Sequence, residues 1–555
     1  MLKLNKESLA HKDLWQKIQI ETPKFDMEDV IKNTLKNPTC LHFGAGNIFR
    51  GYIAALWQDL LEKGEVQTGI IAAELFDYEI IDRIYKPYDN LCLVVTADAK
   101  GNLQKRVIAS ITEALKCDPD FKDDWTRLCE IFKSATLQMV TFTITEKGYN
   151  IFDLEGKYLP QVREDIENGP EKPKSSMGKV ASLLYVRYRN GKHPIAVVSL
   201  DNCSRNGERL YSSIIQIAKE WAKNKLVEEG FVEYLSNPSS VSFPWSMIDK
   251  IVPRPSESIK ELLEKDRLEK MDIICTSKNT YIAPFVNTEK SQYLVIEDSF
   301  PNGRPPLEKA GVYFADRQTV ENSERMKVQT CLNPLHTALA IFGCLLGYRT
   351  IYEEVKDRCL KKLIEKIGYE EGLPVVVDPG IIDPKEYLKE VIEERFPNPY
   401  IPDTPQRIAT DTSQKMPVRF GETIKAYSES PNLDVRSLKF IPLVIAGWLR
   451  YLLCVDDSGK PFEPSPDPLL DELRKYISGI ELGREVENLD QKLKPILSNQ
   501  TLFRVNLFEV GLAEKVIGYF KEMIEGAGAV RKTLEKCWMQ LNKKERSRMG
   551  KWVLK

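Results

Sequence analysis

Short apolar runs alternate with amphipathic segments through the first half of the chain. The apolar runs have the length and the β-branched, aliphatic composition of buried strands, and they lie at 39–43, 68–77, 91–97, 137–145 and 194–200. Between the last two runs, the segment 175–192 begins with serine, keeps an apolar rhythm of helical period and ends near Gly191. This alternation predicts an α/β fold built on a parallel, doubly wound sheet.

The pattern becomes mainly helical from about residue 256. Ile259, Leu262 and Leu263 share one face of an amphipathic segment, and apolar stripes at helical spacing recur as far as Met523. A strand-like stretch at 280–294 ends the first part. Because 555 residues exceed what one hydrophobic core usually supports, we expect two domains, the first over 1–295 and the second, mainly α-helical, over 296–555.

Composition and charge argue against several classes of protein. A net charge of −2 and a pI near 6.3 provide no large basic field for nucleic acid or an anionic membrane. The N-terminal segment is charged throughout, and no window approaches the ~18 uninterrupted apolar residues of a membrane span, so we expect a cytoplasmic protein. The eleven cysteines form no CxxC pair and the histidines number four. These features predict reduced thiols and no metal site.

The first predicted strand runs directly into a glycine turn and an amphipathic helix. Gly44 and Gly46 stand where a tight turn and a close main-chain approach to a pyrophosphate are needed, although Phe49 replaces the third glycine of the dinucleotide pattern. One βαβ unit later come Glu74 and Asp77, where an acid binds ribose hydroxyls and repels a 2′-phosphate. The pattern indicates a Rossmann-type domain that binds NAD rather than NADP; the alternative is a glycine turn in an unrelated α/β domain.

A charged segment that becomes apolar, 324–348, holds the most suggestive polar residues of the second half. Asn333 precedes Pro334, which predicts that a helix begins here with Asn333 as its N-cap. His336 follows three residues later, so an amide and an imidazole would share the first turn. Taken alone, a capping asparagine and a first-turn histidine are ordinary structural features.

Several segments resemble, in the same order, those of the mannitol dehydrogenase family, the polyol-specific long-chain dehydrogenases. They are the glycine turn at 42–51 and the segments 145–149, 201–207, 243–255, 324–348 and 395–423. The sequence around Asn333 is most similar to that of the branch that interconverts D-fructuronate and D-mannonate. The resemblance implies a Rossmann-type domain, a mainly helical C-terminal domain and a metal-independent, NAD-linked oxidoreductase.

The resemblance also implies roles for individual residues. It implies catalytic roles for Lys327, Asn333 and His336, and substrate contacts at Asn202, Arg407 and Lys415. Together with the glycine pattern, it predicts cofactor contacts at Gly44, Gly46, Asn47, Phe49, Arg50, Glu74, Asp77, Glu146, Lys147 and Asp249. In one departure from the family motif, Asn333 follows Lys327 by six positions instead of five. Without the resemblance, 395–423 would be interpreted as a solvated turn between helices.

Reduction of a sugar carbonyl requires a group that gives a proton to the substrate oxygen. Lys327 is the candidate, with burial or nearby cations lowering its pKa from an ordinary value of about 10.4. We expect Asn333 and His336 to donate hydrogen bonds to the reacting oxygen. The segment "YEEVK" at Tyr352–Lys356 matches the Tyr-xxx-Lys letters of short-chain dehydrogenases, but it lies away from any predicted strand end and is attributed to chance.

The predicted substrate depends on a group of cations. Arg407, Lys415 and Arg419 could hold the carboxylate of a keto-uronate, which agrees with the D-fructuronate and D-mannonate pair of hexuronate catabolism. The same basic pair accompanies neutral polyols in the family, so a mannitol 2-dehydrogenase (fructose and mannitol) and a tagaturonate reductase stay as alternatives. A sensor that binds NAD or a sugar acid without turnover is a further alternative, which the proton donor argues against.

Overall fold

The computed structural model describes residues 2–401 and 403–538 and divides into two compact units, Met1–Glu321 and Asn322–Lys555. The division lies within helix α12 (Arg317–Arg325), later than the expected boundary at 295/296. A cut at 295 would split strand β14 (Tyr293–Glu297), which pairs with β10 (Ser246–Asp249) and β15 (Tyr313–Ala315). The first unit therefore extends past residue 295. Residues 539–555 of the expected second domain lie outside the described residues.

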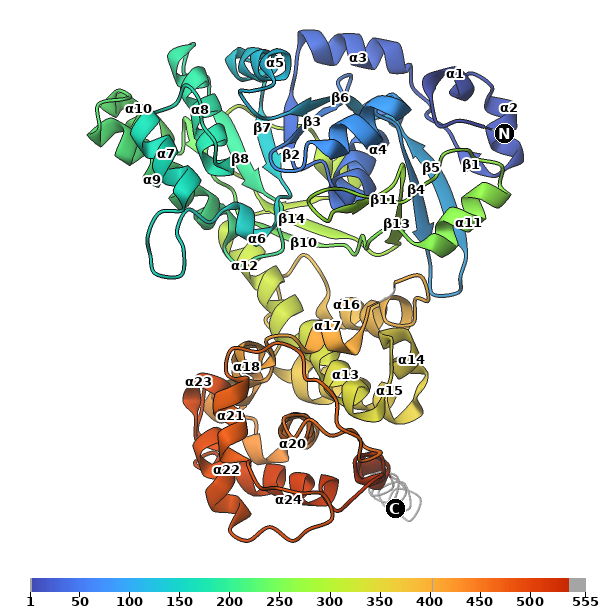
Figure 1. The fold of residues 1–555 in the computed structure, drawn as a ribbon, viewed down its shortest axis with the longest axis vertical. Coiled ribbons are helices and arrows are strands. Elements are labelled where there is room, and N and C mark those ends of the chain that lie inside the picture. Colours follow the sequence, from blue (N-terminus) through green and yellow to red (C-terminus); the bar gives the residue numbers. More distant parts are fainter. Residues whose placement is uncertain (1, 402, 539–555) are drawn as a thin grey trace. The chain divides into compact units, whose positions relative to one another are not determined.

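A six-stranded parallel sheet forms the centre of the first unit (Figure 1). Its spatial order is β6 (Ile111–Lys116), β3 (Ile70–Glu74), β2 (Cys40–Phe43), β7 (Met139–Phe142), β8 (Ile195–Ser199) and β9 (Val241–Ser242). Counted along the chain, this is the 3-2-1-4-5-6 order of a dinucleotide-binding sheet. The strand order reverses between β2 and β7, which places the glycine turn after β2 at the switch point.

One predicted strand belongs to a different sheet. The run 91–97 forms β4 (Cys92–Ala97), which pairs antiparallel with β5 (Leu103–Ile108) and parallel with β13 (Phe285–Glu289). The link between β4 and β5 spans only 98–102, which is too short for a parallel crossover and closes a hairpin instead. The prediction that 91–97 joins the parallel sheet was therefore wrong. Two strands of that sheet, β6 and β9, had not been revealed by the apolar pattern.

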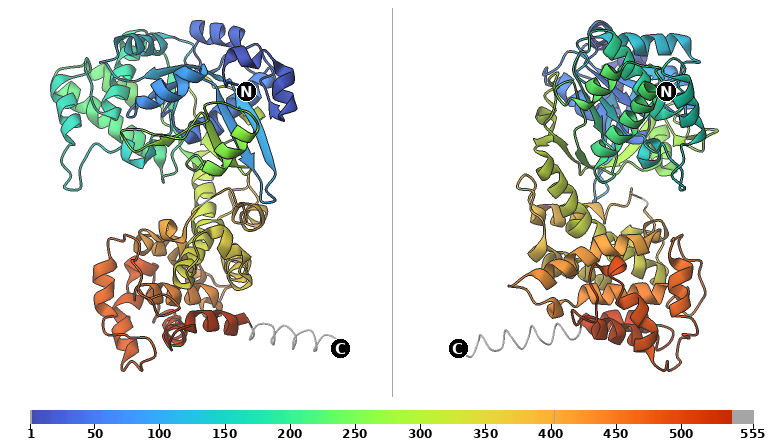
Figure 2. Two further views of the ribbon diagram at one scale, coloured as in Figure 1. Left: turned by 45° about the vertical axis from the view of Figure 1, so that its right-hand side comes forward. Right: turned by 90° about the vertical axis from the view of Figure 1, so that its left-hand side faces the viewer.

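Helices cover both faces of the parallel sheet (Figures 1 and 2). One face packs against α5 (Lys122–Lys133), α7 (Pro160–Asn168), α8 (Ser176–Arg189), α9 (Asn206–Lys223) and α10 (Glu229–Ser236). The other face packs against the π-helical η1 (Phe49–Ile53) and α4 (Ala54–Glu62). As predicted for 175–192, Ser175 caps α8 by accepting a hydrogen bond from Gly178. Burial on both faces explains why these strands are apolar without alternation.

Shorter elements complete the first unit. They are α1 (Lys6–Leu9), α2 (Lys12–Lys17), β1 (Ile20–Glu21), α3 (Met27–Lys36), α6 (Thr145–Gly148), α11 (Glu257–Lys265), β11 (Ile274–Cys275) and β12 (Tyr281–Ile282). In α11, Ile259 and Leu263 are fully buried, as its amphipathic pattern predicts. The stretch expected to form a strand at 280–294 is divided among β12, β13 and the first residues of β14.

The second unit is built from helices. A helical run over Arg317–Leu346 begins in the last residues of the first unit and consists of α12, the π-helical η5 (Met326–Cys331) and α13 (Asn333–Leu346), with a break at Leu332. This run is long and apolar enough to cross a membrane, but 78% of its most apolar window is buried inside the protein, as expected for a core helix. Helix α20 (Phe440–Tyr451) packs against α13 and α24 (Ala513–Met523).

The other helices of the second unit surround this core. They are α14 (Ile351–Lys356), α15 (Arg358–Glu365), α16 (Pro384–Glu390), α17 (Pro405–Ala409), α18 (Thr412–Met416), α19 (Glu422–Glu429), α21 (Leu470–Tyr476), α22 (Leu489–Leu497) and α23 (Gln500–Phe503). The buried carboxylate of Glu371 accepts hydrogen bonds from three N–H groups at the start of α20. It satisfies donors that the helix itself leaves unpaired.

Candidate cofactor and catalytic sites

The two glycines of the turn after β2 have different surroundings. Gly44 has φ +102°, and a Cβ there would overlap the carbonyl oxygen of Thr143. A Cβ on Gly46 would meet no atom within 4 Å. Gly44 is therefore needed by the fold, whereas Gly46 leaves open space beside the start of a helix. That space suits an approaching pyrophosphate, so this part of the structure fits a dinucleotide.

Glu74 and Asp77 are both buried, but their hydrogen bonds differ. The Glu74 carboxylate accepts hydrogen bonds from the N–H groups of Ala45 (2.7 Å), Phe76 (3.0 Å) and Asp77 (3.2 Å), and burial raises its pKa. One Asp77 oxygen accepts from the hydroxyl of Thr276 (2.6 Å), and its other oxygen has no partner among the described residues. Glu74 thus holds the glycine turn in place, and Asp77 keeps an unused acceptor.

The residues that follow the glycine turn pack inside the protein. The Phe49 ring is fully buried and stacks on His42 with 4.3 Å between ring centroids. The buried guanidinium of Arg50 donates to the side-chain oxygen of Asn47 (2.8 Å) and to the carbonyl oxygen of Ala283 (2.6 Å). Phe49 and Arg50 therefore offer no exposed side-chain surface to a ligand. Asn47 is half-buried and oriented by Arg50.

Two residues that the sequence analysis did not single out shape the loops after β7 and β8. Asp201 accepts hydrogen bonds from the N–H groups of Ile144 and Thr145 (both 2.9 Å) and from the hydroxyl of Tyr149 (2.5 Å). Asn206 is the buried first residue of α9 and donates to Ser246 Oγ (2.9 Å). Asn206 and Gly207 are thus the first two residues of a helix.

Three of the predicted site residues lie on these loops, and a fourth ends β10. Asn202 is exposed and follows Asp201 directly, and Lys147 is exposed in the short helix α6. Glu146, also exposed, forms an ion pair with Arg209. Asp249 is the last residue of β10 and is 7% exposed. All four are in the first unit.

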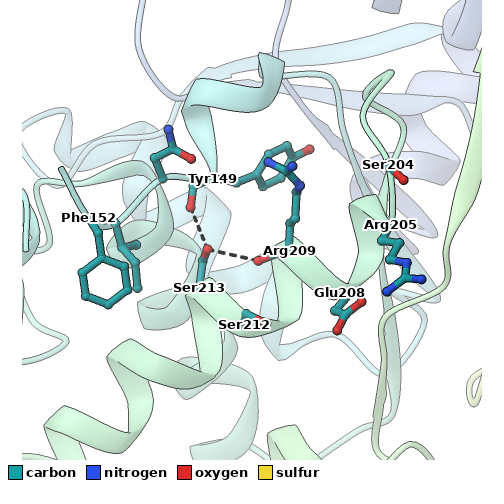
Figure 3. A pocket seen from close by; sticks show the side chains of 10 residues that line it. Tyr149, Phe152, Ser204, Arg205, Glu208, Arg209, Ser212 and Ser213 are labelled. Carbon is teal, nitrogen blue, oxygen red and sulfur yellow. Dashed lines mark hydrogen bonds between the residues drawn. The ribbon is translucent and has the colours of Figure 1, made fainter. Parts of the chain in front are cut away.

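One hollow lies beside these loops, and another lies beyond the end of β3. The larger, of about 590 Å³, is lined by residues 149–152 and by the start of α9 (Figure 3). Its Ser213 hydroxyl lies 2.6 Å from the carbonyl oxygen of Tyr149 and 3.0 Å from that of Arg209, so this hydroxyl is satisfied within the chain. The smaller, of about 400 Å³, lies at the carboxyl ends of β3 and β6 and includes Phe76, whose side chain is largely exposed.

In the second unit, Lys327 lies in a π-helical turn. The residue is 2% exposed, and its carbonyl oxygen accepts a hydrogen bond from the N–H of Leu332 (3.1 Å), five residues later. A π-turn holds one more residue than an α-turn and occurs often at functional sites. This wider turn lies within the six positions between Lys327 and Asn333.

Helix α13 begins where it was predicted, but its cap differs. Asn333 is the first helical residue and Leu332 is the N-cap, with no side-chain capping bond. The prediction that Asn333 is the N-cap was therefore wrong. The physical reason is that the chain arrives from a preceding helical segment and leaves only Leu332 as a break, so there is no extended residue to cap. Asn333 is half-buried, and its amide is not used as a cap.

His336 lies in a pocket of charged and aromatic side chains. Its Nε2 is 3.5 Å from Oδ2 of Asp403, and its ring centroid is 5.3 Å from that of Phe396. Burial, together with the nearby guanidinium groups of Arg419 and Arg407, lowers the pKa of His336 to about 4, although Asp403 opposes this shift. The imidazole is therefore neutral at pH 7.

The predicted cations lie around the same histidine. Arg407 donates to Asp403 from Nε (2.6 Å) and Nη2 (2.5 Å). Lys415 donates to the carbonyl oxygens of Ile408 (2.9 Å) and Thr410, and burial and Arg419 lower its pKa to about 8. Arg419 donates to the Thr337 hydroxyl, and burial lowers its pKa to about 10. The structure thus brings His336, Arg407, Lys415 and Arg419 together.

The segment Tyr352–Lys356 lies in α14. Lys356 lies over the Tyr352 ring, 3.8 Å from its centroid, and both belong to one helix face. Glu354 of the same segment is fully buried, and neither of its carboxylate oxygens has a partner among the described residues. Burial, and secondarily the charge of Asp403, raises the pKa of Glu354 well above its ordinary value.

Two family models match the chain. The mannitol dehydrogenase Rossmann domain matches residues 38–309, and the mannitol dehydrogenase C-terminal domain matches residues 319–523. The chain belongs to the mannitol dehydrogenase family. Both the resemblance and the predicted fold class, a Rossmann-type sheet followed by a mainly helical domain, are confirmed.

Relatives within the mannitol dehydrogenase family cover most of the chain. A D-mannonate oxidoreductase of Thermotoga maritima is 62% identical over 96% of this chain and 98% of its own length. A mannitol 2-dehydrogenase of Aspergillus fumigatus is 30% identical over 85% of this chain and 88% of its own. A D-mannonate oxidoreductase of Escherichia coli is 29% identical over 78% of this chain and 84% of its own.

Solved structures of the mannitol dehydrogenase family have the same fold. A substrate-free D-sorbitol dehydrogenase is 25% identical, covers 92% of this chain and 97% of its own, and has a TM-score of 0.75. The mannitol 2-dehydrogenase of Pseudomonas fluorescens, in a ternary complex with NAD and D-mannitol, is 25% identical, covers 97% of this chain and 100% of its own, and has a TM-score of 0.69.

In this mannitol dehydrogenase family member, the sequence analysis missed Asp403 and Phe76. Asp403 lies four residues before Arg407, and opposite charges at that spacing were an available signal for a pair. Phe76 comes two residues after Glu74, in the loop that follows the strand. Over 2–401 and 403–538, no group of three or more His, Cys, Asp or Glu side chains is placed to hold a metal ion.

Proposed function

We propose that this protein is an NAD-dependent D-mannonate oxidoreductase that interconverts D-mannonate and D-fructuronate. The observation that carries the proposal is the 62% identity to the Thermotoga maritima D-mannonate oxidoreductase over nearly the full length of both chains. The first unit supports NAD as the cofactor, because its strand order and glycine turn fit a dinucleotide. The proposed substrates are small sugar acids, and the proposed location is the cytoplasm.

The cofactor would be held by the edge of the sheet where the glycine turn lies. When bound, NADH supplies the hydride that reduces the carbonyl carbon. The open space at Gly46 would admit the pyrophosphate, and the helix that begins at Asn47 would offer it main-chain N–H groups. Asp77 keeps an unused oxygen for a ribose hydroxyl, whereas Glu74 orders the turn. The hollow beside Phe76 would hold the adenine.

Lys327 is the proposed acid/base. In the reducing direction its ammonium gives a proton to the ketone oxygen of D-fructuronate as the carbonyl carbon gains the hydride, and in the reverse direction the neutral amine accepts that proton from the hydroxyl of D-mannonate. Its near-complete burial in the π-turn removes it from bulk water. The amide of Asn333, at the start of the next helix, would donate a hydrogen bond to the same oxygen.

The cations of the second unit support a carboxylate-bearing substrate. Arg407 and Arg419 lie near His336, and Lys415 lies near both of them. Asp403 pairs with Arg407, the charges of Asp411 and Asp467 act on Lys415, and Arg419 donates to the Thr337 hydroxyl. A uronate carboxylate would pair with these cations. A neutral polyol would not, which disfavours the mannitol 2-dehydrogenase alternative despite the 30% identity to such enzymes.

The test is the rate of NADH oxidation with D-fructuronate, D-tagaturonate and D-fructose, measured in parallel at equal concentrations. The proposal predicts the highest kcat/KM with D-fructuronate and reduction of NAD with D-mannonate in reverse. A preference for D-fructose would make the protein a mannitol dehydrogenase, and a preference for D-tagaturonate would make it a tagaturonate reductase. A change in tryptophan fluorescence on NADH addition without turnover of any of them would favour the sensor.

A further inference from the structure

Asp403 connects two of the proposed site residues. Its carboxylate accepts two hydrogen bonds from Arg407, at 2.6 Å from Nε and 2.5 Å from Nη2, and its Oδ2 lies 3.5 Å from Nε2 of His336. The Asp403 and His336 side chains are 11% and 15% exposed. A largely buried carboxylate therefore lies between an imidazole and a guanidinium, and each of its oxygens has a cationic or potentially cationic partner.

The position of this carboxylate is fixed by the chain around it. The N–H of Thr404 donates to Oδ1 of Asp403 (2.9 Å), and the N–H of Ile351, at the start of α14, donates to its carbonyl oxygen (3.0 Å). Thr404 is in turn the N-cap of α17, the helix that carries Arg407. Asp403 is therefore held by α14 on one side and by α17 on the other, so it provides a fixed point for both partners.

The Asp403 carboxylate also decides which nitrogen of His336 carries the proton. A neutral imidazole has one N–H, and a carboxylate beside Nε2 favours the tautomer with the proton on that nitrogen. Nδ1 then keeps a lone pair and accepts a hydrogen bond. This differs from the expectation that His336 donates to the reacting oxygen, and it gives His336 a substrate hydroxyl to bind instead.

The same contact orients Arg407. A guanidinium has five N–H groups in a rigid planar fork. Asp403 occupies the edge formed by Nε and Nη2, which leaves the outer edge, with one N–H from each terminal nitrogen, for a second carboxylate. The Arg407 side chain is 69% exposed, so without Asp403 its long stem would be free to adopt other rotamers.

We propose that Asp403 is a positioning residue that fixes His336 as the acceptor of a substrate hydroxyl and directs the outer edge of the Arg407 guanidinium toward the substrate carboxylate. The proposal rests on the proposed function for the identity of the substrate. Its geometry does not depend on that identity, because the contacts are present without a ligand. Asp403 touches neither the reacting carbon nor the cofactor in this role and acts through its two partners.

A double-mutant cycle tests whether Asp403 acts through Arg407. The variants are Asp403→Asn, Arg407→Ala and the double variant, and the readout is kcat and KM with D-fructuronate. We expect each single variant to lower kcat/KM by about tenfold or more, and for Arg407→Ala mainly through KM. The kcat/KM of the double variant should be within about threefold of that of the less active single variant. Losses that multiply would show independent action and would overturn the proposal.

A crystal structure of Asp403→Asn without substrate provides a second readout. The proposal predicts that the Arg407 guanidinium leaves its position and that the His336 ring rotates. Both groups unmoved would contradict it. Asp383→Asn is the matched control, because the Asp383 side chain caps α16 by accepting hydrogen bonds from the main-chain N–H groups of Lys385 and Glu386. If the wild type fails to reduce D-fructuronate, the proposed function is wrong, whereas this structure still decides the role of Asp403.

Discussion

The cofactor edge of the first unit and the cation cluster of the second unit are built in opposite ways. At the cofactor edge, the side chains of Phe49, Arg50 and Glu74 are buried and serve the main chain, and the surface left for a ligand is a glycine turn. In the cation cluster, side chains such as those of His336 and Lys415 lie near the same two arginines, Arg407 and Arg419, and have displaced pKa values.

This difference assigns different tasks to the two regions. Main-chain N–H groups recognise a phosphate whatever the neighbouring side chains are, so the cofactor edge provides binding that depends on shape. Proton transfer needs a titratable side chain whose pKa is displaced, and the second unit supplies buried ones. Substitutions at the cofactor edge should therefore change NADH affinity or stability, and substitutions in the second unit should change turnover and its pH dependence.

The largest effect is expected for Lys327→Ala. Loss of the proton donor should lower kcat by about 1,000-fold, within the range of general acid/base catalysis. Steady-state NADH oxidation with D-fructuronate measures this change. Lys361→Ala, on the neighbouring α15 and without a proposed role, is the control. Turnover of Lys327→Ala within tenfold of the wild type would mean that another group supplies the proton.

The glycine pair separates fold from cofactor binding. Gly44→Ala should destabilise the first unit by about 3 kcal/mol, because its Cβ overlaps Thr143 and its φ is positive. Gly46→Ala should leave the melting temperature unchanged and weaken NADH binding, because its Cβ enters open space. Differential scanning fluorimetry with and without NADH distinguishes the two. Equal losses of stability would show that both glycines serve only the fold.

Lys415 should impose a pH dependence on substrate binding. Its pKa is lowered to about 8, first by burial and then by Arg419. The ammonium is therefore present below about pH 8 and lost above it, so KM for D-fructuronate should rise by up to about tenfold per pH unit on the alkaline side. Lys415→Arg should flatten this rise, because arginine stays protonated. A wild-type KM that is flat to about pH 10 would contradict the prediction.

Removal of one residue from the π-turn should have a small effect on turnover. If η5 only absorbs the additional residue, deletion of Gln329 converts the turn to an α-helical one and keeps Lys327 and Asn333 in comparable positions. We expect kcat to fall by less than about tenfold. A loss as large as that of Lys327→Ala would mean that the π-turn itself places the lysine.

Glu354 should affect stability and not chemistry. Its folded-state pKa is raised above the ordinary 4.5, so the unfolded chain releases this proton before the folded protein does. The contribution of Glu354 to the free energy of unfolding is therefore fully present below about pH 4.5 and is lost as the pH rises toward the folded-state pKa. Glu354→Gln should raise the melting temperature at pH 8 by about 2 °C and by less at pH 5. A larger gain at pH 5 would contradict this assignment.

The sequence predicted the elements whose patterns are local. The glycine turn, α8 with its Ser175 cap and the start of α13 follow from short-range signals, and the family resemblance located Lys327, His336 and Arg407. The apolar pattern could not predict that 91–97 joins another sheet, because an apolar strand does not specify which strand it pairs with. The π-turn and the bridge through Asp403 depend on tertiary contacts that no spacing rule contains.

The most direct test of the division of tasks is the dissociation constant of NADH, measured by fluorescence titration for Gly46→Ala and Lys327→Ala side by side. We expect weaker binding for Gly46→Ala, with kcat at saturating NADH close to the wild type, and unchanged binding for Lys327→Ala, with turnover abolished. If Lys327→Ala weakened NADH binding as much as Gly46→Ala did, the two regions would not have separate tasks.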